Sequence, residues 1–305
     1  MSQTVLILGA TGRLGRHAAA AFSSAGWHVR VFNRHTDTLE TAVYDVDVIV
    51  NAWNPAYPDW VAQMPRLHSA VIRAARLVNA TVIVPGNVYV YGSEAPAPWS
   101  ADTPHLATNP LGRNRQSMER AYRDSGVRTI LLRGGDFIDT QESGNWFDKI
   151  MTAKLNRGRL VYPGATDIPH AWAYLPDMAR AAVALAEMRD KLSDFEDIPF
   201  PGYTLTGVEI AKHLSDITGQ NVGLSPFNWR AIRLAVPFWK LARHLLEMRY
   251  LWNKPHSLDA ARFDTLLPDF EPTPVAQALA SAIGHASQVQ INPDQPVSAR
   301  VGAFM

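Results

Sequence analysis

The stretch that decides the fold lies near the N-terminus and reads Val5-Leu6-Ile7-Leu8-Gly9-Ala10-Thr11-Gly12-Arg13-Leu14-Gly15-Arg16-His17. Its apolar start is typical of a strand that is covered on both faces, as in a parallel sheet. The glycines that follow indicate a tight turn, and residues 18–22 are mostly good helix formers that continue a helix after it. The stretch therefore predicts a strand, a glycine-rich loop and a helix in direct succession.

Each glycine of this loop has a separate structural reason. Gly9 permits the tight turn, Gly12 lets a phosphate approach the backbone, and Gly15 lets the helix pack closely on its strand. The free amides and the positive dipole end of a helix N-terminus attract a pyrophosphate. An ordinary strand-to-helix turn is the alternative interpretation. The predicted contacts with a dinucleotide cofactor in this loop are Gly9, Thr11, Gly12, Arg13, Leu14 and Gly15.

A second predicted strand, residues 28–32, ends in the polar pair Asn33-Arg34. In a dinucleotide-binding fold this position contacts the adenosine ribose. An acidic residue here would bind the 2′-hydroxyl of NAD, whereas an amide and a guanidinium suit a 2′-phosphate better. We therefore expect NADP to be preferred over NAD, with Asn33 and Arg34 as contacts. A solvated surface charge is the alternative for Arg34.

The composition is that of an ordinary globular protein with a sizeable core. Of 305 residues, 47% are apolar and 19% are charged. The 29 basic and 28 acidic residues form no long block of like charge, so neither a nucleic acid nor a membrane is expected as a partner. The absence of cysteine excludes disulfides and thiolate metal sites, and no metal is predicted. Neither a membrane span nor a signal peptide is visible, which indicates a cytoplasmic protein.

Strand and helix patterns alternate beyond residue 34. Strands are predicted at 47–51, 81–84 and 127–132, and helices at 60–79, with Pro65 in the first turn, and 110–124. This rhythm predicts an α/β fold with a doubly wound parallel sheet, the Rossmann fold. Because residues 35–46 are only 12 residues long, they have room for a helix or a strand but not both. We expect a short helix or loop there, and no long third strand.

The pattern changes after residue 135. Helices are predicted around 146–157, at 178–188, 206–218 and 274–283, and as one or two helices over 228–252 that are interrupted at Pro237. Residues 1–135, with about 170–206, are interpreted as the dinucleotide-binding core. Residues 136–169 and 207–284 are interpreted as a smaller, mainly helical substrate-binding region, and 285–305 as a C-terminal tail.

Several motifs match the pattern of one known family. The matching segments are the glycine spacing of residues 9–15, Pro85-Gly86-Asn87-Val88-Tyr89-Val90-Tyr91-Gly92, Asn109-Pro110-Leu111-Gly112-Arg113-Asn114-Arg115 with Glu119, and Leu132-Arg133-Gly134-Gly135-Asp136-Phe137. Together they resemble the extended short-chain dehydrogenase/reductase superfamily, in its NAD(P)-dependent epimerase/dehydratase-like branch. The resemblance covers about the first 220 residues.

The positions of the superfamily's catalytic residues differ in this chain. In the superfamily a Tyr is the acid/base, a Lys lowers its pKa and holds the ribose, and a Ser or Thr steadies the substrate oxygen. Here these positions hold Leu111, Arg115 and Asn87. Leucine transfers no proton, so the usual mechanism does not carry over at Leu111. Arg115 can still hold a nicotinamide ribose, and the amide of Asn87 can donate a hydrogen bond to a carbonyl.

Other groups must then supply the proton. Tyr89 lies two residues beyond Asn87 on the same expected strand, so the two side chains would share a face. Asp136 replaces an Asn that faces substrate in the superfamily, and His170 lies in a predicted Pro/Trp/Tyr-rich loop. Tyr89, Asp136, His170 and Asn87 are therefore the candidate catalytic residues. Their structural alternatives are packing for Tyr89, capping of a turn for Asp136, and a hydrogen-bonded surface position for His170.

The chain beyond the strand at 47–51 would lie at the carboxyl end of the sheet, where a cofactor binds. Additional cofactor contacts are expected from Asn51, Ala52, Trp53 and Arg115. The expected substrate contacts are Trp53, Asn54, Tyr89, Asp136 and His170.

The sequence thus favours an NADP-preferring oxidoreductase that acts on a small-molecule carbonyl or alcohol, with NAD as the other possible cofactor. A catalytically silent NADP-binding redox sensor and a nucleotide-sugar epimerase or dehydratase are the alternatives. The small-molecule substrate is the predicted partner, and a homodimer stays open.

Overall fold

The computed structural model, which describes residues 3–284, is built around a six-stranded parallel sheet with the strand order β2-β1-β3-β4-β5-β9. Every neighbouring pair in this sheet is parallel. The doubly wound α/β fold predicted from the sequence is confirmed. The strands are β1 Thr4–Leu8, β2 His28–Val31, β3 Val48–Asn51, β4 Thr81–Gly86, β5 Thr129–Arg133 and β9 Phe195–Pro199.

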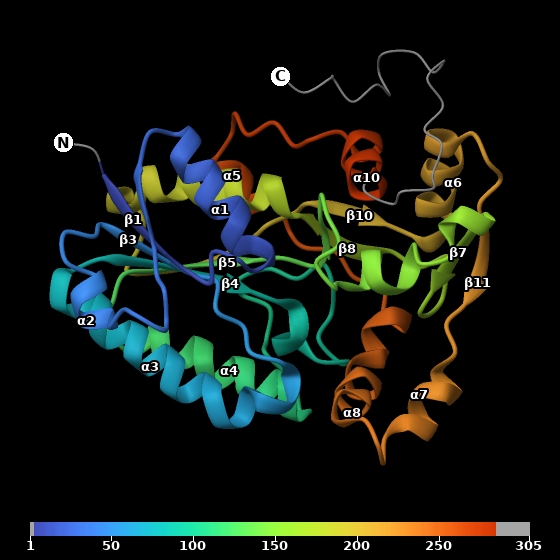
Figure 1. The fold of residues 1–305 in the computed structure, drawn as a ribbon, viewed down its shortest axis with the longest axis horizontal. Helices are drawn as coiled ribbons and strands as arrows, with labels where there is room; N and C mark the ends of the chain where they lie inside the picture. The colour runs from blue at the N-terminus through green and yellow to red at the C-terminus, as the bar shows by residue number, and fades with distance from the viewer. Residues whose placement is uncertain (1–2, 285–305) are drawn as a thin grey trace.

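Helices cover both faces of the sheet (Figure 1). On one face lie α1 Arg13–Ser24 and α5 Leu175–Glu187, and on the other lie α2 Leu39–Ala42, α3 Trp60–Val78 and α4 Pro110–Arg123. Val5 and Ile7 belong to the core beneath α1 and α5, whereas Leu6 and Leu8 belong to the core beneath α3 and α4. Successive residues of a strand face opposite sides, so the apolar run in β1 is unbroken because both sides are covered.

The short segment between β2 and β3 behaves as its length predicts. It contains the four-residue helix α2 and no strand, and β3 pairs directly with β1. The expectation of a missing third strand is confirmed.

Two expected helices differ from those observed. Helix α3 begins at Trp60, so Pro65 lies inside the helix and not in its first turn. Proline is tolerated there because it removes only one donor, and the carbonyl that loses its partner belongs to Val61, a residue 73% exposed. The helix expected around 146–157 is split into a π-helical turn, Phe147–Met151, and a 3₁₀ turn, Leu155–Arg157.

The second half of the chain also contains small sheets. Strands β6 Asp136–Ile138, β8 His170–Tyr174 and β10 Tyr203–Leu205 form one of them, and β7 Arg159–Tyr162 pairs with β11 Gly223–Pro226. Helix α5 and strand β9 return to the large sheet. The later helices are α6 Gly207–Thr218, α7 Trp229–Ala235, α8 Lys240–Glu247, α9 Ala261–Leu266 and α10 Val275–Ile283, and short 3₁₀ helices are found at Tyr57–Asp59, Val88–Tyr91, Arg189–Lys191 and Met248–Asn253.

The segment 228–252 is interrupted at Pro237 as predicted, since α7 ends before it and α8 begins after it. The expectation for the tail at 285–305 falls outside the described residues. Among the described residues, no helix is both long enough and apolar enough to cross a membrane.

Candidate cofactor and active site

The glycine turn between β1 and α1 has the geometry that a pyrophosphate needs. Gly9 has φ +80°, a left-handed conformation that favours glycine. A Cβ on Gly15 would lie 2.0 Å from the carbonyl oxygen of Gly9, so α1 packs directly on the turn. A Cβ on Gly12 would meet only that same oxygen, at 3.1 Å, among the described residues. Gly12 is the N-cap of α1 and no side chain among residues 3–284 caps it, which leaves the first amides of the helix available to a dinucleotide phosphate.

The adenosine end of such a site lies after β2. Phe32 and Trp53 pack edge to face with ring centres 5.2 Å apart, and Trp53 lies against Gly9. Arg34 is exposed. Asp37, the acidic residue of this loop, accepts hydrogen bonds from the Asn33 N–H at 2.8 Å and the Thr36 hydroxyl at 2.8 Å. These hydrogen bonds lower the pKa of Asp37 and engage its carboxylate within its own loop.

The side chain of Asn51 takes part in a buried network between the sheet and two helices. Its Nδ2 lies 3.1 Å from Nδ1 of His68 on α3 and 3.0 Å from the hydroxyl of Tyr122 on α4. Burial lowers the pKa of His68 to about 3, so the imidazole is neutral. Because its side chain is engaged there, the predicted contact of Asn51 with a cofactor concerns the backbone. It stays a prediction, as does that of Ala52.

The first turn of α4 contains Leu111, which is buried. Its backbone N–H donates to Oε1 of Glu247, the last residue of α8, over 2.6 Å. The side-chain amide of Asn109 donates to the same oxygen over 2.8 Å. Leu111, where the sequence resemblance implies a catalytic tyrosine, is therefore a core side chain whose backbone N–H is bound by the end of α8.

One turn further along α4, the guanidinium of Arg115 is buried without a salt bridge to any described residue. It lies over the Trp60 ring, 4.5 Å from its centre, and donates to Oδ1 of Asn54 over 3.1 Å. Its Nε has no hydrogen-bond partner among the described residues, and burial lowers the pKa of the guanidinium. Arg115 thus retains a donor for ribose hydroxyls or an anionic group.

Two tyrosine hydroxyls meet beside Arg115. Tyr57, in the 3₁₀ turn Tyr57–Asp59, and Tyr89, in the turn Val88–Tyr91, have their hydroxyl oxygens 2.5 Å apart. Burial raises the pKa of both phenols, that of Tyr89 well above its ordinary value, and the negative charge of Asp136 adds to the effect. Both therefore remain neutral hydrogen-bond donors at physiological pH.

The relation between Asn87 and Tyr89 differs from the expectation. The strand β4 ends at Gly86, and Asn87 is the N-cap of the 3₁₀ turn that contains Tyr89. Its Oδ1 accepts the backbone N–H of Tyr89 over 3.1 Å. The expectation of two residues on one face of a strand was wrong, because this cap turns the chain out of the sheet. The Nδ2 group of Asn87 has no hydrogen bond to the described residues.

Asp136 and His170 form a pair on neighbouring strands, β6 and β8. Oδ2 of Asp136 lies 2.8 Å from Nε2 of His170. His170 is buried and stacks on Trp252, with ring centres 4.5 Å apart and planes within 11°. The expectation that His170 lies in a loop was wrong, as was its surface alternative, since the residue begins β8 beneath an aromatic side chain. Electrostatic effects link Asp136 with Tyr57 and Tyr89, so these groups share one neighbourhood.

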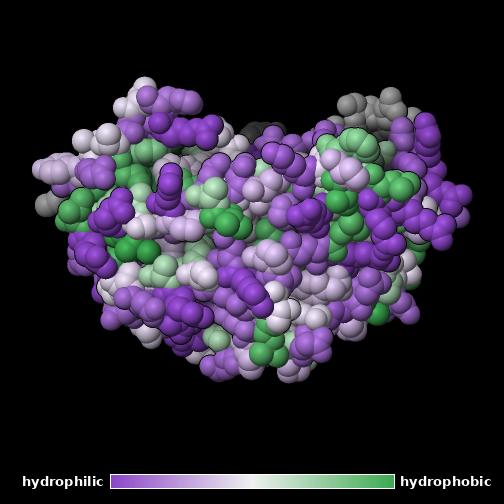
Figure 2. Space-filling model, turned by 90° about the horizontal axis from the view of Figure 1, so that it is seen from below, coloured by the Kyte–Doolittle hydropathy of each residue, from purple (hydrophilic) through white to green (hydrophobic). Residues whose placement is uncertain are grey.

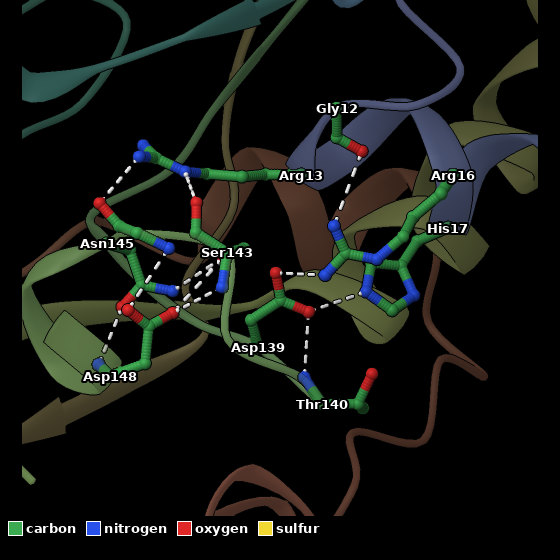
Figure 3. Close-up of polar contacts among 10 residues, drawn as sticks. Gly12, Arg13, Arg16, His17, Asp139, Thr140, Ser143, Asn145 and Asp148 are labelled. Carbon is green, nitrogen blue, oxygen red and sulfur yellow. Dashed lines mark hydrogen bonds and ion pairs between the residues drawn. The ribbon is translucent and has the colours of Figure 1, made fainter. Parts of the chain in front are cut away.

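The loop that follows β6 is held to the start of α1 (Figure 3). Arg13 donates to the carbonyl oxygens of Ser143 over 2.9 Å and Gly144 over 2.7 Å. Arg16 and His17 both contact the carboxylate of Asp139. The side chain of Arg13 is thus engaged by this loop, and its backbone N–H is the group available to a phosphate.

A possible group of metal ligands, His105, Glu119 and Asp197, has its ligand atoms within 4.8 Å of one another. The guanidinium of Arg133 lies between the two carboxylates, at 2.9 Å from Glu119 and 2.5 Å from Asp197. Arg133 supplies the positive charge at this cluster, which therefore joins α4, β5 and β9 as a buried ionic network.

Tyr57 is the residue of this site that the sequence interpretation missed. The signal was available, because Tyr57 lies in the loop after β3, at the same carboxyl edge of the sheet as Trp53 and Asn54. Nothing in the sequence shows that its hydroxyl meets that of Tyr89, 32 residues away.

Comparisons with solved structures agree on the fold. MoeE5 in complex with UDP-glucose and NAD superimposes with a TM-score of 0.72 at 16% identity, over 94% of this chain and 99% of that one. The UDP-glucuronic acid 4-epimerase from Bacillus cereus, in complex with UDP-glucuronic acid and NAD, gives 0.72 at 15% identity over 94% and 99%. The NAD-dependent NDP-hexosamine 5,6-dehydratase TunA gives 0.69 at 14% identity over 94% and 98%.

The chain therefore has the fold of these three structures, which include an NAD-bound UDP-glucuronic acid 4-epimerase and an NAD-dependent NDP-hexosamine 5,6-dehydratase. No protein-family model matches the chain, and no curated protein matches its sequence.

Proposed function

We propose that the protein is an NAD(P)-dependent oxidoreductase of the extended short-chain type, which prefers NADP and acts on a small-molecule carbonyl or alcohol. The observation that carries this proposal is the pair of neutral hydroxyls of Tyr57 and Tyr89, 2.5 Å apart beside the buried Arg115. A paired hydroxyl of this kind provides the proton donor that Leu111 cannot provide.

The residues of the site take the following roles. A bound nicotinamide supplies or accepts a hydride. Tyr89 donates a proton to the carbonyl oxygen during reduction and Tyr57 hydrogen-bonds to Tyr89, while the amide of Asn87 donates a hydrogen bond to the same substrate oxygen. Arg115 holds a ribose hydroxyl. Burial raises the pKa of the two phenols and so keeps them protonated, which leaves a proton on each hydroxyl at the start of a reduction.

The preference for NADP rests on the loop after β2. Arg34 is exposed and engages no carboxylate among the described residues, whereas Asp37 is occupied by Asn33 and Thr36. The 2′-phosphate of NADP therefore meets the free guanidinium of Arg34. The 2′-hydroxyl of NAD meets no free carboxylate there, because that of Asp37 is already hydrogen-bonded.

One observation favours a different function, a silent cofactor-binding sensor. Leu111 is packed in the core and its backbone is tied to Glu247, so the superfamily's usual position for chemistry is closed by α8. The fold of the nucleotide-sugar enzymes also brings UDP-sugars into the set of substrates to test.

A combined binding and turnover experiment tests the proposal. NADP and NAD are titrated into the protein by calorimetry, and NADPH oxidation is followed over a panel of carbonyl compounds that includes UDP-sugars. We expect NADP binding and turnover of at least one carbonyl. The variant Gly12→Ala is expected to weaken cofactor binding, because it adds a Cβ in the proposed phosphate position; its backbone φ of −81° suits alanine, and the Cβ would lie 3.1 Å from the carbonyl oxygen of Gly9. Binding without turnover over the whole panel supports the sensor, and no binding of either cofactor overturns both functions.

A further inference from the structure

A strongly basic segment covers α7, α8 and the turn between them. No Asp or Glu occurs between Asp216 and Glu247, whereas this stretch contains Arg230, Arg233, Lys240 and Arg243. The whole-chain charge of +1 hides this local excess, because it averages over all 305 residues. We call residues 230–243 the α7–α8 tip.

The same tip exposes large apolar side chains. Phe238 is 92% exposed, the highest fraction among the large hydrophobic residues of the described chain, and Leu234 is 78% exposed. Trp239 is 43% exposed. Figure 2, which views the molecule from the side on which α7 and α8 lie in Figure 1, shows hydrophobic residues among hydrophilic ones on this face.

These exposed residues are held in place by the packed sides of the two helices. Trp229 and Ala242 are buried, and Ile232 and Leu245 pack against the core of the C-terminal region. The apolar residues by which α7 and α8 pack on the protein are thus distinct from the apolar residues that the tip exposes to solvent. The exposure of Phe238 and Trp239 follows from their place at the turn around Pro237, between the two helices.

The four basic side chains are free of counter-charges. All four are exposed, and none forms a salt bridge with another residue in the range 3–284. Their charge is therefore available to an anionic partner outside the chain.

We propose that the α7–α8 tip docks on a lipid bilayer that contains anionic headgroups. Phe and Trp side chains insert at the boundary between headgroups and acyl chains, while Arg and Lys contact the phosphates around them. A second copy of this chain fits the tip less well, since a symmetric contact brings two basic faces together. This inference does not depend on the proposed oxidoreductase function.

Vesicle sedimentation of the full chain tests the inference. The probes are vesicles of phosphatidylcholine alone and of phosphatidylcholine mixed with an equal part of phosphatidylglycerol. We expect binding to the mixed vesicles that weakens as salt is raised, and little binding to phosphatidylcholine. The double variant Phe238→Ser/Trp239→Ser lowers the partition coefficient at least ~10-fold, and each neutralisation, such as Arg233→Gln, lowers it about fivefold.

Matched controls use exposed residues elsewhere on the same protein. The first control is Leu77→Ser, at a residue on α3 that is 67% exposed. The second is Arg120→Gln, at an exposed residue on α4. Both leave the partition coefficient unchanged. Circular dichroism confirms that each variant is folded. Equal binding to both vesicle types, no binding to either, or equal effects of tip and control variants overturns the proposal. A dimer detected by light scattering and abolished by Phe238→Ser, without vesicle binding, assigns the tip to a second copy instead.

Discussion

The carboxylate of Glu247 at the end of α8 accepts the backbone N–H of Leu111 at the start of α4, over 2.6 Å. The first N–H groups of a helix have no partner within the helix, and the helix dipole favours a negative charge near them. Glu247 therefore caps α4 from a distance of 136 residues along the chain. This contact joins the C-terminal region to the helix on which Arg115 lies.

Removal of this cap destabilises the fold. Glu247→Ala lowers the free energy of unfolding by about 1–2 kcal/mol, because two donors, the Leu111 N–H and the Asn109 amide, lose their acceptor. Glu247→Gln costs less, since an amide oxygen still accepts. Urea unfolding measures both, with Glu187→Ala as the exposed control, for which a change within about 0.5 kcal/mol is expected. Equal losses for Glu247→Ala and Glu187→Ala contradict the assigned cap.

Arg34→Ala separates the two cofactors. We expect the Kd of NADP to rise by about 10-fold or more and that of NAD to change little, because only NADP carries the 2′-phosphate. Calorimetric titration measures both constants. Arg73→Ala, at an exposed residue on α3, is the control. A wild-type preference for NAD, or equal losses for the two cofactors, shows that Arg34 does not contact a 2′-phosphate.

Tyr89→Phe and Tyr57→Phe test the proton donor without changing its shape. Each lowers turnover by ~10²-fold while the affinity for NADP stays unchanged, since only a hydroxyl is removed. The control is Tyr44→Phe, at a residue that is 69% exposed, and this variant leaves turnover unaltered. If Asp136→Asn or His170→Gln abolishes turnover and both tyrosine variants remain active, the proton comes from the Asp136–His170 pair.

His68 makes the stability of the fold sensitive to acid. Its pKa is about 3 in the folded protein against an ordinary value of 6.5, so between these values the unfolded chain binds a proton that the native protein does not. The free energy of unfolding therefore falls as the pH falls below 6.5, by up to about 1.4 kcal/mol per pH unit for this group. His68→Asn reduces that slope between pH 6 and pH 4 in urea titrations. His28→Gln, at an exposed residue, leaves it unchanged, and an unaltered slope in His68→Asn contradicts the assignment.

Local sequence signals predicted most of the fold. The helix predicted at 206–218 begins with a capping box in which Thr206 and Glu209 exchange hydrogen bonds, and Gly219 ends it with φ +67°. The strand–loop–helix at residues 5–17 is likewise encoded by neighbours in the chain. Such elements were predictable because their caps and apolar periods lie within one stretch.

The candidate site could be predicted only in part, because its contacts join distant residues. The departure at Leu111 is visible in the sequence, but the pairing of Tyr57 with Tyr89 depends on two 3₁₀ turns at separate strand ends. In the same way, the burial of His170 depends on Trp252, which stacks on it from 82 positions further along the chain. No local pattern carries that information.

The hydrogen bonds from Arg13 to the carbonyls of Ser143 and Gly144 make the glycine turn and the loop after β6 one mechanical unit. Arg16 and His17 hold the same loop through Asp139, one helical turn further along α1. Thermodynamic linkage between two such parts is reciprocal. A ligand that stabilises the start of α1 therefore also stabilises the loop after β6. Conversely, a group that displaces this loop changes the conformation of the glycine turn, where the phosphates are proposed to bind.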